Sequence, residues 1–243
     1  MKAKLQNFNK QLGNIDHIFV AVLVIFLLQQ FSQMPSQTLN HNGWHDLGMV
    51  IVSLILYSIA IYWCYALIST NKNLDTHHEL YNSIKYVCLI ICTIVIINQF
   101  WAIYGTQLLH VASGGTSTNQ AGLNDMRKTL AGSFLEWITV IFLGPITEET
   151  IFRYALIGPK AIRSKISRIA GTTISIIIFA GLHMIVQFLE ISNTNQLHAA
   201  IFSFVQYLVI STIFSLSYYF RNNIRENIAI HMAYNIFAML VSL

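Results

Sequence analysis

The chain has 243 residues and a mass of 27.6 kDa; 55% of the residues are hydrophobic and only 10% are charged. Soluble domains carry about 25% charged residues, so this sequence has too little charge to cover a soluble globule of its size. A pI near 9.0 could indicate nucleic-acid binding, but the basic residues are scattered between apolar runs and form no basic domain. The composition predicts a membrane protein with no nucleic-acid partner.

Several apolar runs approach or exceed the roughly 20 residues that a helix needs to cross a bilayer. No series of ~10-residue alternating segments indicates an outer-membrane barrel. We therefore predict an all-α, polytopic helical membrane protein, with residues 1–243 forming a single integral membrane domain of about seven transmembrane helices. Their expected ranges are 15–32, 47–68, 86–104, 133–156, 169–188, 198–220 and 227–243.

The first apolar run follows three lysines and has the charge pattern of a secretory signal peptide. However, Leu28 is followed by Gln29, Gln30 and Phe31, which do not form a small-residue cleavage site. We therefore interpret this run as a retained transmembrane helix.

The positions of Lys and Arg predict the orientation, because these residues accumulate in cytoplasmic loops near the ends of spans. The opposite loops contain only Arg127 and Lys128, so we predict a cytoplasmic N-terminus. Residues 160–168 alternate basic and apolar side chains, which fits either a short interfacial helix or an ordinary cytoplasmic loop. The basic residues on the predicted cytoplasmic side are Lys2, Lys4, Lys10, Lys72, Lys85, Lys160, Arg163, Lys165, Arg168, Arg221 and Arg225.

The most informative residues are ionisable side chains inside apolar spans, since each costs at least about 2.5–3.5 kcal/mol at membrane depth unless it is paired or hydrated. In the fourth predicted span, Glu148 and Glu149 are followed by Arg153. Glu149 and Arg153 are i,i+4 neighbours that can pair, whereas Glu148 points about 100° round the helix. The Glu149–Arg153 pair alone is equally well explained as an ion pair that holds helices together. Glu148, however, has no such partner in the sequence pattern.

Gly144 and Pro145 precede the two acids and predict a break in the fourth helix. Proline removes a backbone donor and crowds the carbonyl four residues earlier, at Ile141, so we expect the helix to kink or restart there. A restart would place both glutamates near a new N-terminus, where the helix dipole favours negative charge. Broken helices with ionisable residues at membrane depth often build binding sites.

Two later spans contribute histidines. Phe179 and His183 share the fifth predicted span, in which Ala180 and Gly181 are expected to permit close helix approach. His231 and Asn235 have i,i+4 spacing in the seventh span, which places them on one face. Each pair alone is more typical of an interhelical hydrogen bond. Together with the acids, they supply a general base, an imidazole that can hold water and donors for an oxyanion, as acyl hydrolysis requires.

These three blocks resemble the motifs of the CPBP family of intramembrane proteases, which includes the eukaryotic Ras-converting CaaX endopeptidase and the bacterial Abi and bacteriocin self-immunity proteins. The family pattern is E-E-x-x-x-R, then F-x-x-x-H, then H-x-x-x-N. The corresponding blocks here are Glu148–Arg153, Phe179–His183 and His231–Asn235, in the family's order and on three predicted helices. We therefore expect a CPBP-like catalytic core over residues 129–243, preceded by spans of unassigned role over residues 1–128.

The resemblance implies an intramembrane endopeptidase that acts on a membrane-associated peptide or protein. Glu148 would activate a water with help from His183, while His231 and Asn235 would stabilise the oxyanion or complete the water site. No cofactor is expected. Zinc is the less favoured alternative, because Glu and His can ligate it but the H-E-x-x-H motif is absent. The candidate catalytic residues are Glu148, Glu149, His183, His231 and Asn235, with Arg153 and Phe179 in supporting roles.

Short bacterial members of the family often confer self-immunity to bacteriocins or process peptide signals, so the resemblance implies a bacterial cell membrane and one of these roles. Two other hypotheses are a non-catalytic scaffold or regulator with the protease fold and a small transporter built on a broken helix. The complete set of motif residues argues against the scaffold, and the lack of repeat symmetry argues against the transporter. The sequence makes no prediction of the oligomeric state.

Overall fold

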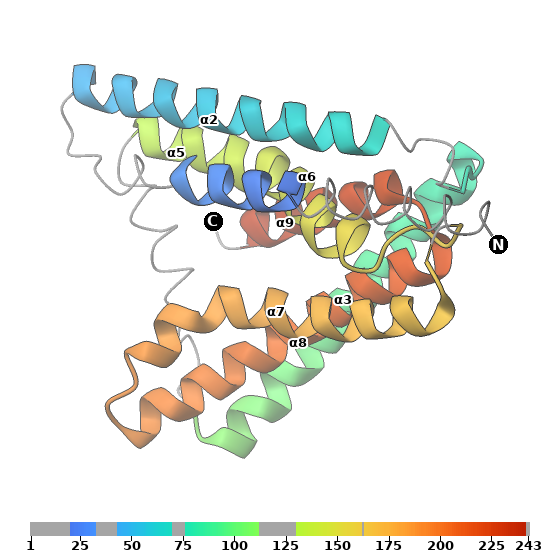
Figure 1. Ribbon diagram of the computed structural model, residues 1–243. Helices are drawn as coiled ribbons and strands as arrows, with labels where there is room; N and C mark the ends of the chain where they lie inside the picture. Colours follow the sequence, from blue (N-terminus) through green and yellow to red (C-terminus); the bar gives the residue numbers. More distant parts are fainter. Residues whose placement is uncertain (1–19, 33–42, 70–75, 112–129, 162, 242–243) are drawn as a thin grey trace.

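The computed structural model describes residues 20–32, 43–69, 76–111, 130–161 and 163–241. Every regular element in these ranges is helical, which confirms the all-α fold. The helices overlap each of the seven predicted spans, of which residues 15–19 and 242–243 lie outside the described residues. Residues 130–155 form one continuous helix, here called the central helix, made of α5 (Leu130–Ile138), η3 (Thr139–Leu143), α6 (Gly144–Glu149) and η4 (Thr150–Ala155). The other helices are Val20–Ser32, α2 (Gly43–Ser69), α3 (Leu80–Leu109), α7 (Lys165–Leu189), α8 (Thr194–Arg221) and α9 (Ile224–Val241) (Figure 1).

Large apolar side chains cover the outer faces of the bundle. On α3, for example, Leu89, Ile96, Phe100 and Leu108 are all exposed. Soluble proteins rarely expose contiguous apolar patches of this extent, whereas a bilayer solvates them. Four of the described helices are long and apolar enough to cross a membrane: Asp46–Ser69 within α2, α3, α7 and α8. The chain is therefore an integral membrane protein.

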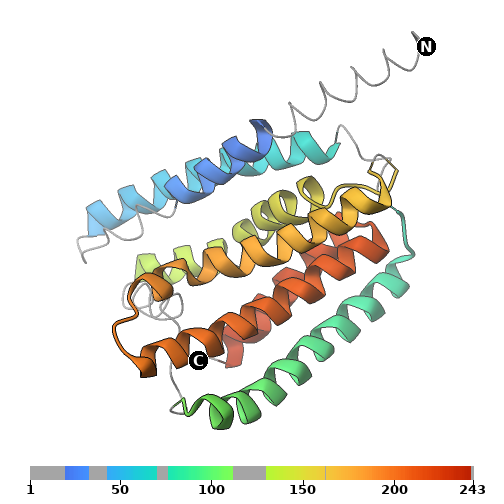
Figure 2. The same cartoon turned by 60° about the horizontal axis from the view of Figure 1, so that its bottom comes forward.

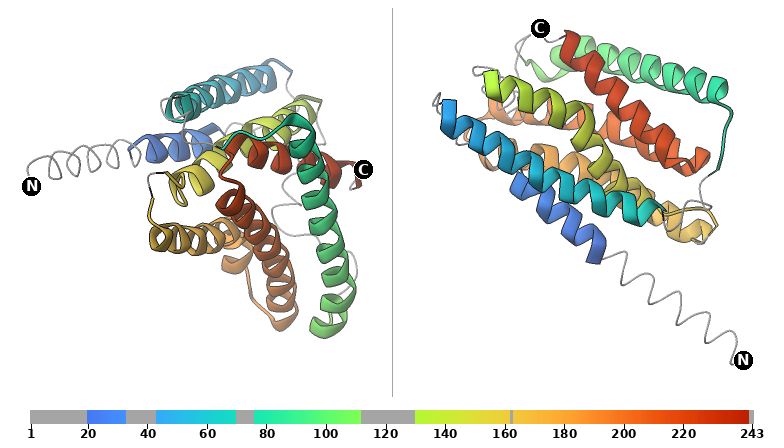
Figure 3. Two further views of the ribbon diagram at one scale, coloured as in Figure 1. Left: turned by 90° about the vertical axis from the view of Figure 1, so that its right-hand side faces the viewer. Right: turned by 90° about the horizontal axis from the view of Figure 1, so that it is seen from above.

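The central helix lies in the interior of the bundle. It packs against α2 on one side and against α9 on the other (Figure 3). The α9 helix also contacts α3 and α8, and α7 runs along α8 (Figure 2). The α9 helix, which carries His231, thus packs against the α6 segment that carries both glutamates, and α7, which carries His183, contacts η4 directly after it.

Three loops meet at the end of the bundle that the basic residues predict to be cytoplasmic. Asn222 ends α8 with a φ of 52°, a left-handed conformation that asparagine adopts more readily than most residues. Its carbonyl oxygen accepts from the backbone N–H of Thr76 at 2.9 Å, and its side-chain oxygen accepts from that of Lys160 at 2.6 Å. Predicted cytoplasmic loops far apart in sequence are therefore tied together at one end.

The described residues of the alternating segment, 160–161 and 163–168, form a loop followed by the first turn of α7. The helix begins at Lys165, and the side chain of Ser164 caps it by accepting from the backbone N–H of Ser167 at 3.1 Å. Arg168, already inside α7, donates to the carbonyl oxygens of Gly158 at 3.1 Å and Tyr219 at 2.8 Å. The described part of this segment contains no separate interfacial helix, in agreement with the loop interpretation.

A glycine on α7 permits close packing, but it is not the predicted one. A Cβ atom at Gly171 would lie 2.2 Å from the carbonyl oxygen of Leu156, so α7 can approach the end of the central helix only with glycine there. A Cβ atom at Gly181 would have no neighbour within 4 Å. The expectation of a close approach is therefore wrong for Gly181, whereas Ala180 is fully buried. Gly171 supplies a close approach about three turns earlier.

Candidate active site

The central helix does not break at Pro145. Leu143 and Thr150, which flank α6, both keep right-handed helical dihedral angles, so the expected restart with a new N-terminus is wrong. The chain instead passes through two π-helical segments, η3 before α6 and η4 after it. In η3 the N–H of Gly144 reaches the carbonyl oxygen of Thr139, five residues earlier. Such π segments are often found at functional sites.

Asn235 compensates for the donor that the proline lacks. In the π register of η3, an N–H at position 145 would pair with the carbonyl oxygen of Val140, but proline has no N–H. The side-chain nitrogen of Asn235 donates to this oxygen at 2.7 Å. Asn235 therefore fastens α9 to the central helix, and the second hydrogen on its nitrogen is the one that can donate to a ligand.

Glu149 is fully buried, and both of its oxygens have partners. Its Oε1 accepts from Nδ1 of His231 at 2.8 Å and lies 3.2 Å from Nη1 of Arg153, which is the predicted i,i+4 ion pair. Its Oε2 accepts from Nδ2 of Asn227 at 2.6 Å. Because an ionised carboxylate only accepts hydrogen bonds, Nδ1 of His231 carries a proton and Nε2 points away from Glu149.

Arg153 is also fully buried and lies among aromatic rings. Its guanidinium carbon is 4.4 Å from the centre of the Phe179 ring and 5.5 Å from that of Phe214. Its Nη2 donates to the hydroxyl of Ser211 at 3.5 Å. A buried cation without a counter-ion is very costly, so the contact with Glu149 and the ring faces together keep Arg153 stable at this depth.

Glu148 is the acid with the looser environment. Its side chain is 16% exposed, in contrast to that of Glu149. Oε1 accepts from Nε2 of Gln29 at 3.1 Å, and Oε2 lies 3.8 Å from Nε2 of His231, which is longer than a hydrogen bond. Glu148 is therefore the carboxylate with room for a water molecule.

His183 lies close to this group but does not join it through a hydrogen bond. Its Nδ1 donates to the carbonyl oxygen of Phe179 at 2.8 Å, so Nε2 is the ring nitrogen that presents a lone pair in the neutral imidazole. The Phe179 ring lies 4.4 Å from the His183 ring and 6.1 Å from the His231 ring, so both histidines flank one aromatic side chain. Within the described residues, no hydrogen bond or ion pair links His183 to Glu148.

Sequence reasoning missed two residues of this cluster. Asn227 precedes His231 by four residues and Asn235 by eight, so the i,i+4 spacing that revealed the latter two also includes Asn227. Gln29 had no comparable signal, because it lies in a different helix, 119 residues before Glu148.

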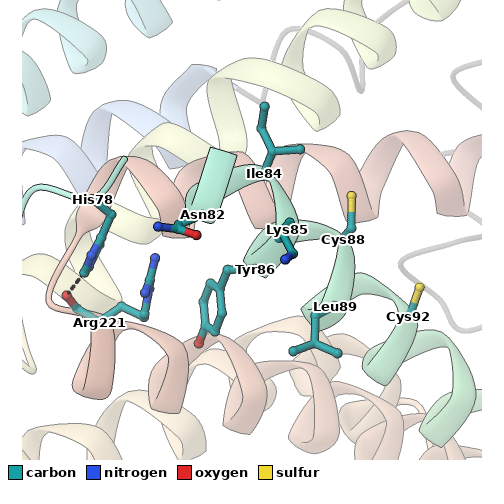
Figure 4. Close-up of a pocket in the computed structure, with 9 residues that line it drawn as sticks. All are labelled: His78, Asn82, Ile84, Lys85, Tyr86, Cys88, Leu89, Cys92 and Arg221. Atoms are coloured by element: carbon teal, nitrogen blue, oxygen red, sulfur yellow. Dashed lines mark hydrogen bonds between the residues drawn. The ribbon is translucent and has the colours of Figure 1, made fainter. Parts of the chain in front are cut away.

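A surface groove of about 750 Å³ lies elsewhere on the bundle, along the start of α3 and the end of α8 (Figure 4). None of the predicted site residues lines this groove. Its lining residues are His78, Asn82, Ile84, Lys85, Tyr86, Cys88, Leu89, Cys92 and Arg221.

The zinc alternative requires three or more suitable ligands in one place. Among the described residues, no such group of His, Cys, Asp and Glu side chains is arranged to hold a metal ion. The hydrogen bonds of Glu149 and of Nδ1 of His231 also engage atoms that would otherwise be available as ligands.

Comparison with known proteins agrees with the motif positions. Residues 130–237 match the family model described as type II CAAX prenyl endopeptidase Rce1-like. The match begins with the central helix and extends past Asn235, so it contains all three motif blocks and confirms the resemblance. Comparisons with curated proteins and with solved structures gave no match. Over residues 130–237, this chain is therefore similar to the Rce1-like type II CAAX prenyl endopeptidases, a family of membrane proteases.

Proposed function

We propose that the protein is an intramembrane endopeptidase that hydrolyses a peptide bond in a membrane-associated peptide or protein. The observation that carries the proposal is the difference between two adjacent acids. Glu149 is buried and bonded through both oxygens, whereas Glu148 is partly exposed and has one oxygen without a hydrogen bond to the described part of the chain. A general base needs a carboxylate that a water molecule can reach.

In the proposed reaction, Glu148 takes a proton from a water molecule, and the water oxygen attacks the scissile carbonyl carbon. The Nε2 lone pair of His183 accepts the second hydrogen of that water and orients it. When the tetrahedral intermediate collapses, the C–N bond breaks and the proton held by Glu148 passes to the leaving amine. Glu148 is then ready for the next cycle.

Two side chains are proposed to stabilise the oxyanion of the intermediate. Asn235 offers the second hydrogen on its nitrogen, which the bond to Val140 leaves available. His231 donates from Nε2 when that atom carries a proton, and Glu149 balances the charge through Nδ1. Glu149 and Arg153 act in this scheme by holding His231, rather than by touching the substrate.

The decisive experiment compares membrane peptides from cells that carry the intact protein, Glu148→Ala or the control Glu79→Ala, which changes an exposed acid outside the site. We expect one cleavage product in the wild type and in the control, and none with Glu148→Ala at equal protein level. Continued cleavage by Glu148→Ala would refute the proposed base. A biological phenotype retained in that variant, without any cleavage product, would favour the scaffold hypothesis.

We also propose that the end of the bundle at which the loops of Thr76, Lys160 and Asn222 meet faces the cytoplasm of a bacterial cell, as the distribution of Lys and Arg predicts. Lys160 and Ser192 are exposed residues that precede and follow α7, and so mark its opposite ends. In a background without Cys88 and Cys92, a membrane-impermeant maleimide added to intact cells should label Ser192→Cys and leave Lys160→Cys unlabelled. The reverse pattern would invert the proposed topology.

For the biological role, we propose bacteriocin self-immunity or the processing of a peptide signal. A strain that carries Glu148→Ala in place of the native residue should become sensitive to its own bacteriocin or should accumulate an unprocessed peptide. Unchanged sensitivity together with unchanged peptide processing would exclude both roles.

A further inference from the structure

The contact between Gln29 and Glu148 brings a residue from outside the matched family region into the candidate site. Gln29 lies in the helix Val20–Ser32, well before residues 130–237. Its side chain is buried, with the residue only 4% exposed, and its Nε2 donates to Oε1 of Glu148 at 3.1 Å. An unpaired carboxamide at such a position would be costly, so this hydrogen bond matters for the position of both side chains.

The packing of the helix Val20–Ser32 holds Gln29 in this place. Ala21, Ile25, Gln29 and Ser32 are buried and follow one another at helical spacing, whereas the neighbouring Gln30 is exposed. Ile25 belongs to the same buried cluster as Ile151 of the central helix and Phe179 of α7. The face that carries Gln29 is therefore anchored against the elements that form the site.

The two carboxylate oxygens of Glu148 have different surroundings. Oε1 is held by Gln29, and Oε2 faces His231 across 3.8 Å without a hydrogen bond. A carboxylate fixed through one oxygen has a defined orientation for the other, which is the property that a general base needs.

We propose that Gln29 is a positioning residue for the reaction: it fixes Glu148 so that Oε2 can take the proton from water. This inference rests on the proposed function. It also means that the catalytic arrangement extends beyond the region shared with the family, and that the helix Val20–Ser32 is required for hydrolysis as well as for stability.

Three substitutions separate positioning from simple packing. Gln29→Met keeps the size of the side chain but removes the donor; Gln30→Met makes the same change at the adjacent, exposed position. Ile25→Ala loosens the same buried face and leaves Gln29 unchanged. The assay uses the full-length protein and a synthetic, fluorescence-quenched form of the peptide whose cleavage distinguishes wild type from Glu148→Ala.

We expect Gln29→Met to lower kcat by about 10-fold to 100-fold with KM within about twofold of the wild type, because the base is displaced while substrate contacts are kept. Gln30→Met should match the wild type. Ile25→Ala should lower the unfolding temperature more than Gln29→Met does, yet lower kcat less. If Gln29→Met proves unstable, Gln29→Ala carries the same expectation.

A kcat of Gln29→Met within about twofold of the wild type would overturn the proposal. So would a decrease no larger than that of Ile25→Ala, since loosened packing would then account for it. If wild type and Glu148→Ala do not differ in cleavage, the proposed function itself fails, and that result is distinct from the failure of Gln29 as a positioning residue.

Discussion

Nδ1 of His231 donates to Oε1 of Glu149 at 2.8 Å, and this bond determines that Nε2 of the same ring faces Glu148. The imidazole thus lies between two consecutive glutamates that have different environments. Glu149 also contacts the buried Arg153 and accepts from Asn227, so its charge is balanced within the protein. The pair of acids therefore divides into one that holds the site together and one that is available for chemistry.

This division predicts that one substitution, Glu to Gln, has a large effect on stability at position 149 and a small effect at position 148. Glu149→Gln leaves the buried Arg153 without its counter-ion and should reduce the free energy of unfolding by about 3–5 kcal/mol. Glu148→Gln should change it by less than about 1 kcal/mol, because this side chain is partly exposed and makes a single hydrogen bond with the described residues. Denaturant unfolding of both variants in one detergent measures the difference; equal losses would contradict the assignment.

A second prediction concerns the carbonyl of Val140. Asn235→Ala removes its donor and should reduce the free energy of unfolding by about 1–3 kcal/mol. Pro145→Ala restores a backbone N–H that can pair with the same oxygen in the π register, so Asn235→Ala should cost less in that background. A double-mutant cycle of unfolding free energies tests the coupling. Additive effects would show that Asn235 does not replace the missing N–H.

The two glycines of α7 provide a matched pair. Gly171→Ala places a methyl group against the carbonyl oxygen of Leu156 and should destabilise the fold by about 1–3 kcal/mol or more. Gly181→Ala meets no neighbouring atom and should stabilise the helix by about 0.5–1 kcal/mol. Thermal unfolding in detergent distinguishes the two; a loss at Gly181 as large as at Gly171 would be inconsistent with the described packing.

Metal removal is expected to leave cleavage unchanged. The oxygens of Glu149 and Nδ1 of His231 are engaged in hydrogen bonds within the protein, so the residues that the structure describes offer no third ligand beside Glu148 and His231. Dialysis against EDTA or phenanthroline should therefore keep the cleavage rate within about twofold. Loss of activity on chelation, with recovery on adding zinc, would establish the zinc alternative instead.

The sequence could predict the helices and the pairing of Glu149 with Arg153, because both depend on short-range patterns of apolar and charged residues. It could not predict how the central helix passes Pro145, since the missing donor is replaced by Asn235, which lies 95 residues after Val140. The contact of Gln29 with Glu148 could not be predicted either, because a glutamine near the end of an apolar run normally indicates the membrane interface. These contacts depend on which helices lie side by side, and that information is not local.

Because the central helix contains two π segments, the number of residues in it determines which way its side chains point as much as their identity does. A π turn contains one residue more than the α turn that it replaces, so η3 and η4 each shift the helical phase around α6. Deleting one residue from 139–143 would let this stretch return to α-helical register and would rotate the preceding part of the helix by about 100° relative to Glu148. Insertions and deletions here should therefore be far more damaging than an apolar substitution at the exposed Phe142.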